Sequence, residues 1–403
     1  MVSLTSADNA LKSVYLGVVA NQLNINANPL LSQIKRTSKD VWGKEIIKLA
    51  PFGINGGIGA GSETGSLPTA TGNNYVQFKA TLKNLYGSIE ISDKAIRASK
   101  NDAGAFVNLL NDEMESLVKA SAFNLGRMLY GDGTGLLGTI SSVSTNVLTM
   151  DSVNNFIEGM LVDVYNGTTL VCAGIPVTYV NRSEGKITVD LSGTSGTPAG
   201  TYTVYVQGSK GNEITGLGAI FSTSATLYGL TRSSYPWLAP HKDTALSDRE
   251  ITDALVQSAI DAVEDNADSK INYISCSKAI RRAYQTYLGY YRKNVEVVDI
   301  NGIKTIAHNG IPVVGDRFVK DGEIYLLNTN DFVLHELCDW KWLEGESGNI
   351  LKQKAGYPAY TATLVKYAEL ICDRPNGQAK ITDVSTSVTY PSTTVTIENS
   401  SEE

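Results

Sequence analysis

The chain has 403 residues, of which 42% are hydrophobic, so it is long enough and apolar enough to build two or three domains. Lys and Arg number 34 against 41 Asp and Glu, and the net charge of −7 excludes a protein whose main task is gripping nucleic acid, while weak contact with DNA stays possible. No stretch approaches the roughly 20 apolar residues of a membrane span and no basic secretion signal opens the chain, so we expect a protein of the cytoplasm without membrane contact.

The residue types that carry catalysis or bind metals are sparse and poorly spaced. The three histidines form no H-E-x-x-H motif, and no G-x-S-x-G motif occurs. Gly57, Gly59 and Gly61 follow no nucleotide-binding pattern, and the S-x-x-K spacing at Ser275 lacks its companion motifs. We therefore expect no catalytic residue, no cofactor and no metal. Paired carboxylates, as in a glycosidase, stay open because sequence does not show which ones converge.

The cysteines and large aromatic residues are interpreted as packing residues. The cysteines are far apart, with no C-x-x-C pair, and are expected to be buried reduced thiols: Cys172, Cys276, Cys338 and Cys372. Packing in a core or an interface is favoured over stacking against sugars for the large aromatic residues, which are the cluster Tyr235-Pro236-Trp237 and the pair Trp340 and Trp342.

The first 50 residues predict an arm with one short helix. Residues 5–23 place Leu11, Val14 and Val18 at helical spacing behind a Thr5 cap. Residues 35–48 carry five basic side chains against two acidic ones. That pattern favours a solvated charged face.

A glycine-rich segment at 51–72 separates two strand patterns. It reads PFGINGGIGAGSETGSLPTATG, which has too much Gly, Ser and Thr to bury a core of its own. Alternating apolar residues precede it at 46–49 and follow it at 75–82. The segment is therefore predicted to be the mobile tip of a long hairpin.

Residues 102–130 predict a single long helix. An Asn/Asp cap precedes a stripe that includes Phe106, Met114, Val118 and Leu125. At 1.5 Å per residue this helix would be roughly 40 Å long. It ends at the sequence G-D-G-T-G.

Residues 140–215 change character and predict an inserted β-domain. Val, Thr, Gly and Ser dominate, turn signals recur, and helical periodicity is lost. The flanking sequences are similar, L-G-T-I at 137–140 and L-G-A-I at 217–220. This similarity favours a domain inserted into one otherwise continuous segment.

The remainder alternates helices and strands, which is typical of an α+β or α/β domain. A capping box at Ser247-Asp248-Arg249-Glu250 opens a helical stripe that begins with Ile251. A basic helix is expected at 278–291. Strands are expected at 271–275, 295–300, 311–314, 324–327, 332–334 and 361–370, before a Ser/Thr-rich tail from 381.

This order of elements, with five short stretches, resembles the major capsid protein family of tailed bacteriophages, whose Hong Kong 97-type fold is shared with encapsulins. The stretches are LYGDGTGLLG at 129–138, TRSSYPW at 231–237, NGIPV at 309–313, YLLN at 325–328 and LVKYAEL at 364–370. They recur in order over almost the whole chain outside the insertion.

The resemblance implies an α+β Hong Kong 97-like fold with an inserted small β-domain. Its expected parts are an N-terminal arm (1–50), an extended loop hairpin (51–88), a peripheral domain with a spine helix (89–138), the inserted β-rich domain (139–216), an axial domain (217–340), return strands of the peripheral domain (341–382) and a C-terminal tail (383–403).

The resemblance also implies a non-enzymatic head protein that assembles as hexamers and pentamers into an icosahedral shell around double-stranded DNA. Expected partners are further copies of the chain, a portal, a decoration protein as a further candidate, and weakly bound packaged DNA. A separate scaffolding protein is expected because the chain begins directly at the arm, and assembly is expected in the host bacterial cytoplasm, with the virion capsid as final location. The implied subunit-interface residues are Lys35, Arg36, Trp42, Phe52, Ile54, Ile58, Leu67 and Pro68.

Two alternatives remain beside this interpretation. One is an encapsulin-type protein nanocompartment, which has the same fold and a different cargo. The other is a carbohydrate-active enzyme with an appended β-module.

Overall fold

The computed structural model describes residues 28–94, 103–194, 196–291, 296–300, 303–345, 348 and 350–387, with residues 103–112, 300 and 303 described by their backbone alone. Contacts group the chain into two compact units, unit 1 (Met1–Pro240 and Asn328–Gly377) and unit 2 (His241–Leu327 and Gln378–Glu403). The predicted helix at 5–23 lies outside the described residues. The domain boundaries given above stay predictions. Within the described ranges, no helix is long and apolar enough to cross a membrane.

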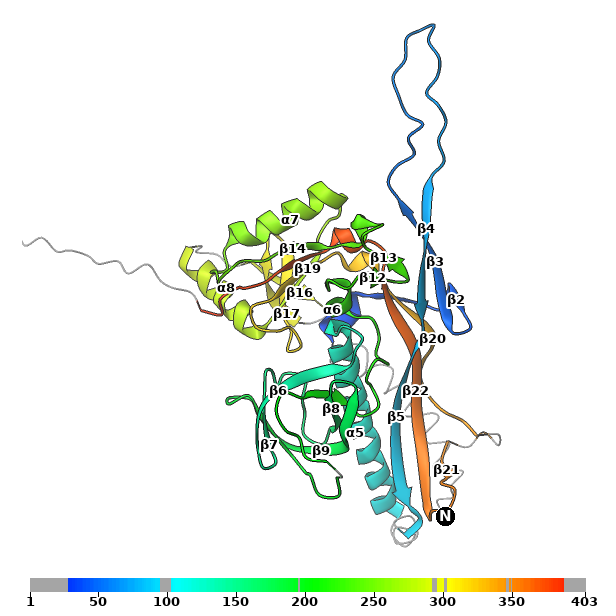
Figure 1. The fold of residues 1–403 in the computed structure, drawn as a ribbon, viewed down its shortest axis with the longest axis vertical. Helices are drawn as coiled ribbons and strands as arrows, with labels where there is room; N and C mark the ends of the chain where they lie inside the picture. Colours follow the sequence, from blue (N-terminus) through cyan, green and yellow to red (C-terminus); the bar gives the residue numbers. More distant parts are fainter. Residues whose placement is uncertain are drawn as a thin grey trace, which may run out of the picture. The chain divides into compact units, whose positions relative to one another are not determined.

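Unit 1 is built on one long helix and a long sheet that is antiparallel except for the parallel pairing of its edge strand β1 with β20 (Figure 1). The central strand β22 (Ala359–Cys372) lies between β20 (Phe332–Trp342) and β5 (Lys83–Ser92); β1 (Lys35–Thr37) pairs with β20 and β21 (Lys352–Gln353) with β22. The predicted helix is confirmed as α5 (Ala103–Tyr130), which packs along β5. It buries Met114, Val118 and Leu125, as its apolar stripe requires.

Strand β5 was not predicted: residues 83–88 were assigned to the end of the hairpin, and residues 89–92 to the start of the peripheral domain without a strand. Its residues alternate between exposed and buried, with Leu85, Ile89 and Ile91 facing the core. Gly87 interrupts the pattern for a reason of packing: a Cβ there would lie 2.8 Å from Leu117 Cδ1 of α5. The glycine lets the helix approach the strand closely.

The predicted hairpin is confirmed as β3 (Glu45–Phe52) and β4 (Asn74–Thr81). Strand β2 (Val41–Trp42) pairs with β3 and completes a three-stranded sheet of order β2-β3-β4. The pairing runs unbroken from Glu45 opposite Thr81 to Phe52 opposite Asn74. Residues 53–73, called the tip below, continue beyond the last pair without regular structure. Short elements complete unit 1: α3 (Pro29–Gln33), α6 (Leu217–Ile220), β12 (Thr226–Leu227), β13 (Leu230–Thr231), η3 (Pro236–Leu238), η4 (Thr329–Asp331) and η5 (Pro375–Gly377).

The inserted segment folds as a closed barrel with strand order β10-β7-β6-β11-β8-β9. The strands are β6 (Leu136–Ser144), β7 (Val147–Met150), β8 (Leu161–Asn166), β9 (Thr169–Asn181), β10 (Lys186–Val189) and β11 (Thr203–Val206). Fully buried residues such as Phe156, Val162, Ile175 and Ile187 fill its core. Closure leaves no unpaired sheet edge, which suits a module inserted into another domain.

Unit 2 is a seven-stranded sheet with order β14-β23-β19-β15-β18-β17-β16, whose core is shared with helices α7 and α8. Its elements are β14 (His241–Asp243), α7 (Asp253–Ala267), β15 (Tyr273–Cys276), α8 (Lys278–Tyr291), β16 (Val297–Ile300), β17 (Ile303–His308), β18 (Ile311–Gly315), β19 (Ile324–Leu327) and β23 (Ala379–Ile381). The strands predicted in this region are confirmed, and β14, β17 and β23 were missed.

The predicted capping box is wrong. Helix α7 is capped by Thr252, whose hydroxyl accepts the Leu255 N–H at 3.1 Å. The backbone of Arg249 instead bonds the segment that follows β23, donating to Asp383 O at 2.9 Å and accepting from Ser385 N at 2.8 Å. This tertiary pairing outweighs the local helix-start signal.

The cysteines are unpaired, and Cys172, Cys276 and Cys372 are buried as expected. Cys338 is only half-buried, so that expectation is wrong for it. It lies where the register of β20 against β22 shifts, and such irregularities turn side chains out of the regular alternation.

Candidate assembly surface

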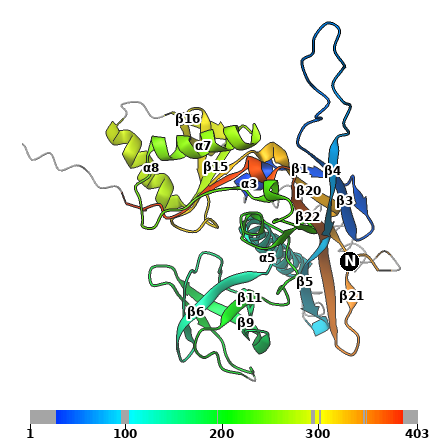
Figure 2. The same cartoon turned by 45° about the horizontal axis from the view of Figure 1, so that its top comes forward.

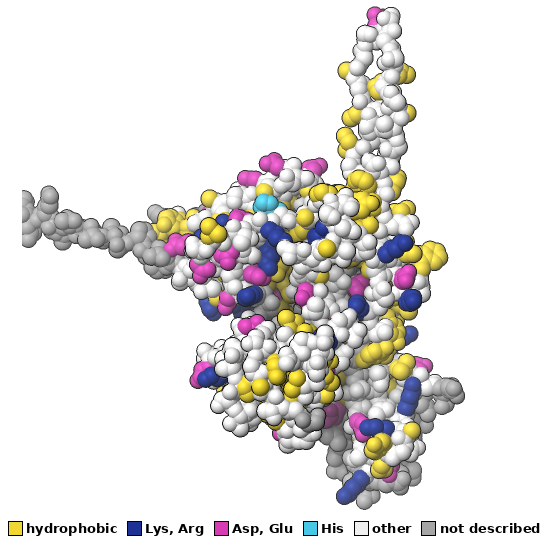
Figure 3. All heavy atoms as spheres, viewed as in Figure 1, with side chains coloured by type: hydrophobic (Ala, Val, Ile, Leu, Met, Phe, Trp, Pro, Cys, Tyr) yellow, Lys and Arg dark blue, Asp and Glu magenta, His cyan; other side chains and the backbone are white. Residues whose placement is uncertain are grey.

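The predicted interface residues of the tip are strongly exposed. Ile54, Ile58 and Leu67 show 76%, 74% and 89% of their surface, and Pro68 is exposed beside them. Figure 3 shows hydrophobic side chains on both flanks of the slender projection. Large aliphatic side chains on this projection are therefore available for contact with another molecule.

Polar contacts, rather than a core, organise the tip. Asn55 Oδ1 accepts from Gly57 N at 2.9 Å and from Thr71 Oγ1 at 3.1 Å, and Asn55 Nδ2 donates to Asn73 Oδ1 at 3.1 Å. These bonds join the two limbs of the tip. Its shape therefore owes little to its exposed aliphatic side chains.

Phe52 belongs to an aromatic cluster at the base of the hairpin. Its ring stacks on Trp237 at 5.7 Å between centroids, and Trp237 lies 6.0 Å from Phe78. The packing role predicted for Trp237 is thereby confirmed. These contacts leave Phe52 half-buried, whereas the apolar side chains of the tip are exposed.

Tyr228 ties the hairpin to the long sheet. Its carbonyl accepts the Lys79 N–H of β4 at 2.9 Å, while its hydroxyl accepts the Cys372 N–H at 3.0 Å and donates to Leu370 O at 3.3 Å. Its backbone has φ +49°, a conformation that costs roughly 1–3 kcal/mol in a non-glycine residue. Burial raises the pKa of Tyr228 well above its ordinary value, so the phenol stays a neutral donor.

The predicted arm residues have different surroundings. Trp42 is 73% exposed and Lys35 is exposed, whereas Arg36 pairs with Asp339 at 3.6 Å. Asp339 in turn accepts a bond from the buried Lys366 at 2.7 Å. Burial opposes ionisation of Asp339, but the Lys366 ammonium outweighs it and lowers the Asp339 pKa. Arg36 is thus bound to the sheet of its own chain.

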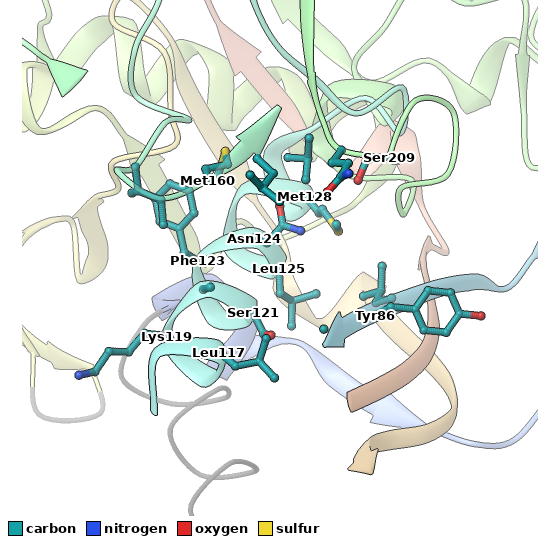
Figure 4. A pocket seen from close by; sticks show the side chains of 18 of the residues that line it. Tyr86, Leu117, Lys119, Ser121, Phe123, Asn124, Leu125, Met128, Met160 and Ser209 are labelled. Carbon is teal, nitrogen blue, oxygen red and sulfur yellow. The ribbon is translucent and has the colours of Figure 1, made fainter. Parts of the chain in front are cut away.

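An open groove of about 830 Å³ lies between α5, β5 and the barrel, within unit 1. Its apolar walls are formed by Leu117, Phe123, Met128, Met160 and Leu161. In Figure 4, Phe123 of α5 and Met160 of the barrel side lie on one flank and Tyr86 of β5 on the other. Trp340 also lines the groove, is 4% exposed, and its Nε1 finds no hydrogen-bond partner within the described part of the chain. Sequence reasoning missed this groove because its walls come from separate segments.

Buried charged groups hold the segment through which the chain leaves the barrel. Arg127 of α5 donates to Glu213 and, at 2.7 Å, to Asn124 Oδ1. Glu369 of β22 accepts the Thr215 N–H at 2.6 Å, and burial raises the pKa of Glu369 to about 7. The exit segment is therefore fixed to both the helix and the sheet.

The described residues hold no group of three or more His, Cys, Asp or Glu placed to bind a metal ion. His335 is fully buried and its Nδ1 lies 3.1 Å from Lys39 O, while His308 Nδ1 lies 2.8 Å from the Tyr284 hydroxyl. Both histidines are thus bonded within the packed interior. Trp340 and Trp342 are buried as well, which confirms their predicted packing role.

No protein-family model matches the chain, and no curated protein sequence matches it. Among solved structures, the chain is similar to the capsid asymmetric unit of cyanophage A-1(L), at 13% identity over 92% of this chain and 93% of that one, with a TM-score of 0.50. It is also similar to the capsid of an empty GTA particle (12% identity, 89% and 91% coverage, TM-score 0.48) and to the SrpI encapsulin of Synechococcus elongatus (10%, 90% and 90%, 0.47). The cyanophage likeness confirms the expected α+β Hong Kong 97-like capsid fold.

Proposed function

We propose that this chain is the major capsid protein of a tailed bacteriophage, a non-enzymatic subunit that self-assembles into hexamers and pentamers of an icosahedral shell around double-stranded DNA. The observation that carries the proposal is the tip, which leaves large aliphatic side chains exposed on a subunit with a capsid fold. Such a surface is stabilised only when another molecule covers it.

Symmetry explains why one exposed tip in each copy is enough to stabilise a whole shell. Fully burying one Leu or Ile side chain contributes about 1.5–3 kcal/mol. Ile54, Ile58 and Leu67 recur in every copy, so a closed shell repeats the gain at each subunit. Trp42 and Lys35 extend the proposed contact surface toward the arm.

The other proposed partners follow from the same assignment. A net charge of −7 suits weak, non-specific contact with packaged DNA, because tight phosphate binding would hinder genome release. A separate scaffolding protein, a portal and a decoration protein complete the proposed partners, with assembly in the host cytoplasm and the virion capsid as final location.

An encapsulin-type shell would use the same fold, and the content of purified particles separates the two functions. Nuclease-protected double-stranded DNA supports the phage capsid, whereas a protein cargo supports the nanocompartment. Hydrolysis of polysaccharides by the purified chain, abolished by one carboxylate substitution, would instead support the enzyme alternative.

The direct test replaces the tip residues Ile54, Ile58 and Leu67 with Ser in a chain expressed with its scaffold. We expect dissociated subunits to melt as the parent does and shell yield in electron microscopy to collapse. A matched control, Leu170→Ser, changes a similarly apolar exposed residue of the barrel (46% exposed). Normal shells from the tip variant would show that the tip is only a linker, and a much lower melting temperature would place it in the subunit core.

A further inference from the structure

One stretch of unit 2 reverses the acidic charge of the chain. The net charge of the whole chain is −7, yet residues 269–295 contain six basic residues and no acidic one. Part of this stretch forms α8, whose basic residues are Lys278, Arg281 and Arg282. The neighbouring helix α7 has four acidic residues and no basic one. Figure 2 shows both helices on the sheet of unit 2, so its two helices carry opposite charges.

The sheet brings two further cations to the start of α8. Cys276 at the end of β15 is paired with Gly315 at the end of β18 and with Ile324 at the start of β19, so the loop between those two strands lies at the same edge. A Cβ on Gly315 would lie 3.2 Å from Arg281 Cδ and 3.4 Å from Lys278 Cα, so α8 starts against this edge. The five basic residues that α8 and the loop contribute are called the basic edge below: Lys278, Arg281, Arg282, Arg317 and Lys320.

The basic edge keeps its positive charge at the surface. Lys278, Arg282 and Lys320 are exposed, and the other two side chains are half-buried. Segments 276–282 and 315–321 contain these five basic residues against two acidic ones, which leaves a surplus of three positive charges. A surplus of this kind attracts anions even when the whole chain is acidic.

Phosphate groups fit this surface better than a protein partner does. Every exposed residue of the two segments is charged: Lys278, Arg282, Lys320 and Asp321. A protein interface would place apolar anchors at its centre, whereas guanidinium and ammonium groups bind phosphate oxygens strongly. Tyr290, 47% exposed, adds a hydroxyl donor roughly 18 Å further along α8. Donors spread over such a length suit an extended row of phosphates.

We propose that the basic edge binds the sugar–phosphate backbone of double-stranded DNA without reading its sequence. The inference rests on the proposed shell function, in which packaged DNA is the duplex available, and assigns the contact to unit 2. The acidic remainder of the chain repels DNA. Contact confined to one small basic surface is weak, so packaged DNA stays releasable.

The salt dependence of duplex binding tests this proposal. The full chain is titrated into a fluorescently labelled duplex of about 30 base pairs, and anisotropy is followed from about 50 to about 200 mM salt. Each phosphate contact contributes about −0.9 to the slope of log K against log salt concentration. Lys278→Gln with Arg282→Gln should therefore reduce the slope by about 2 and weaken binding at least about fivefold at low salt.

The matched control is Lys119→Gln with Lys186→Gln. It also removes two positive charges, from α5 and the barrel, where the side chains are 74% and 40% exposed, and it should leave the slope unchanged. Lys278→Arg with Arg282→Lys keeps both charges and should retain the parent's slope. Lys320→Gln alone should reduce the slope by about 1, which gives an independent test if a double variant unfolds in circular dichroism.

The outcomes separate this proposal from the shell function. Equal slopes for the parent and for both Lys278 with Arg282→Gln and Lys320→Gln overturn the basic edge, as does a parent chain that binds no duplex at low salt. A strong preference for one duplex sequence over another also overturns it, because phosphate contacts carry no sequence information. In each case shells formed with scaffold leave the shell function intact. Gln variants that bind the duplex normally but no longer form shells assign the basic edge to a protein contact instead. A parent chain that forms no shell or capsomer with its scaffold overturns the proposed function itself.

Discussion

Replacing one member of the buried ion pair between Arg127 and Glu213 should strongly lower the free energy of unfolding. Replacing both members with apolar residues should lower it much less. The two side chains are only 3% and 2% exposed. Arg127→Met leaves the Glu213 carboxylate buried without its cation. Removing one partner of such a pair costs about 3–5 kcal/mol, because the remaining charge stays desolvated and unpaired.

The double variant Arg127→Met, Glu213→Leu removes both charges and replaces them with apolar side chains of similar length. Substitutions of this kind are often close to neutral. We therefore expect the double variant to be more stable than either single variant by at least about 2 kcal/mol. The loss of the Arg127 bond to Asn124 keeps it from fully matching the parent.

Urea unfolding of dissociated subunits, followed by circular dichroism, measures this cycle. Lys186→Met is the control, since the pair between Lys186 and Glu184 is 40% and 56% exposed and exposed pairs contribute about 0–1 kcal/mol. Single variants that lose less than about 1 kcal/mol, or a double variant as unstable as the sum of both, would refute the assignment of a desolvated pair.

Three further outcomes are expected. Tyr228→Phe should cost about 1–3 kcal/mol in urea unfolding, because the buried Cys372 N–H loses its acceptor; the exposed Tyr179→Phe should be neutral. Trp237→Ala should speed hydrogen exchange of the β3 and β4 amides, because the hairpin base loses its aromatic packing; unchanged exchange would contradict this. Glu369 has a folded pKa of about 7 against an ordinary 4.5, so its contribution to stability is complete below about pH 4.5 and lost as pH rises through 7. Urea midpoints from pH 5 to 8 should fall more steeply for the parent than for Glu369→Gln, and parallel curves would argue against a buried, titrating carboxyl.

Elements with strong local patterns could be predicted from the sequence. Helix α5 was expected because its apolar stripe repeats at helical spacing over many turns. A small inserted β-domain was expected because turn signals and β-branched residues recur without helical periodicity, whereas its closure into a barrel was not predicted. The hairpin followed from alternation on both sides of a glycine-rich segment. Each of these signals resides within one continuous stretch of chain.

Features that depend on distant partners could not be predicted in this way. Strand β5 directly follows β4 with only Leu82 between them, so no turn marked the passage from the hairpin to the long sheet. The start of α7 moved because Arg249 found backbone partners near Asp383 and Ser385. Sequence periodicity contains no information on such pairings.

The same distinction applies to function. The sequence by itself determined the kinds of element, the absence of catalytic motifs and an exposed, coreless tip, because these depend on residue types and their spacing. Only the tertiary structure decided that Phe52 packs on Trp237, that Arg36 pairs with Asp339, and that α5 and the barrel enclose a groove. Those contacts join residues far apart in the chain, and their geometry exists only once the long sheet, the helix and the barrel have packed together.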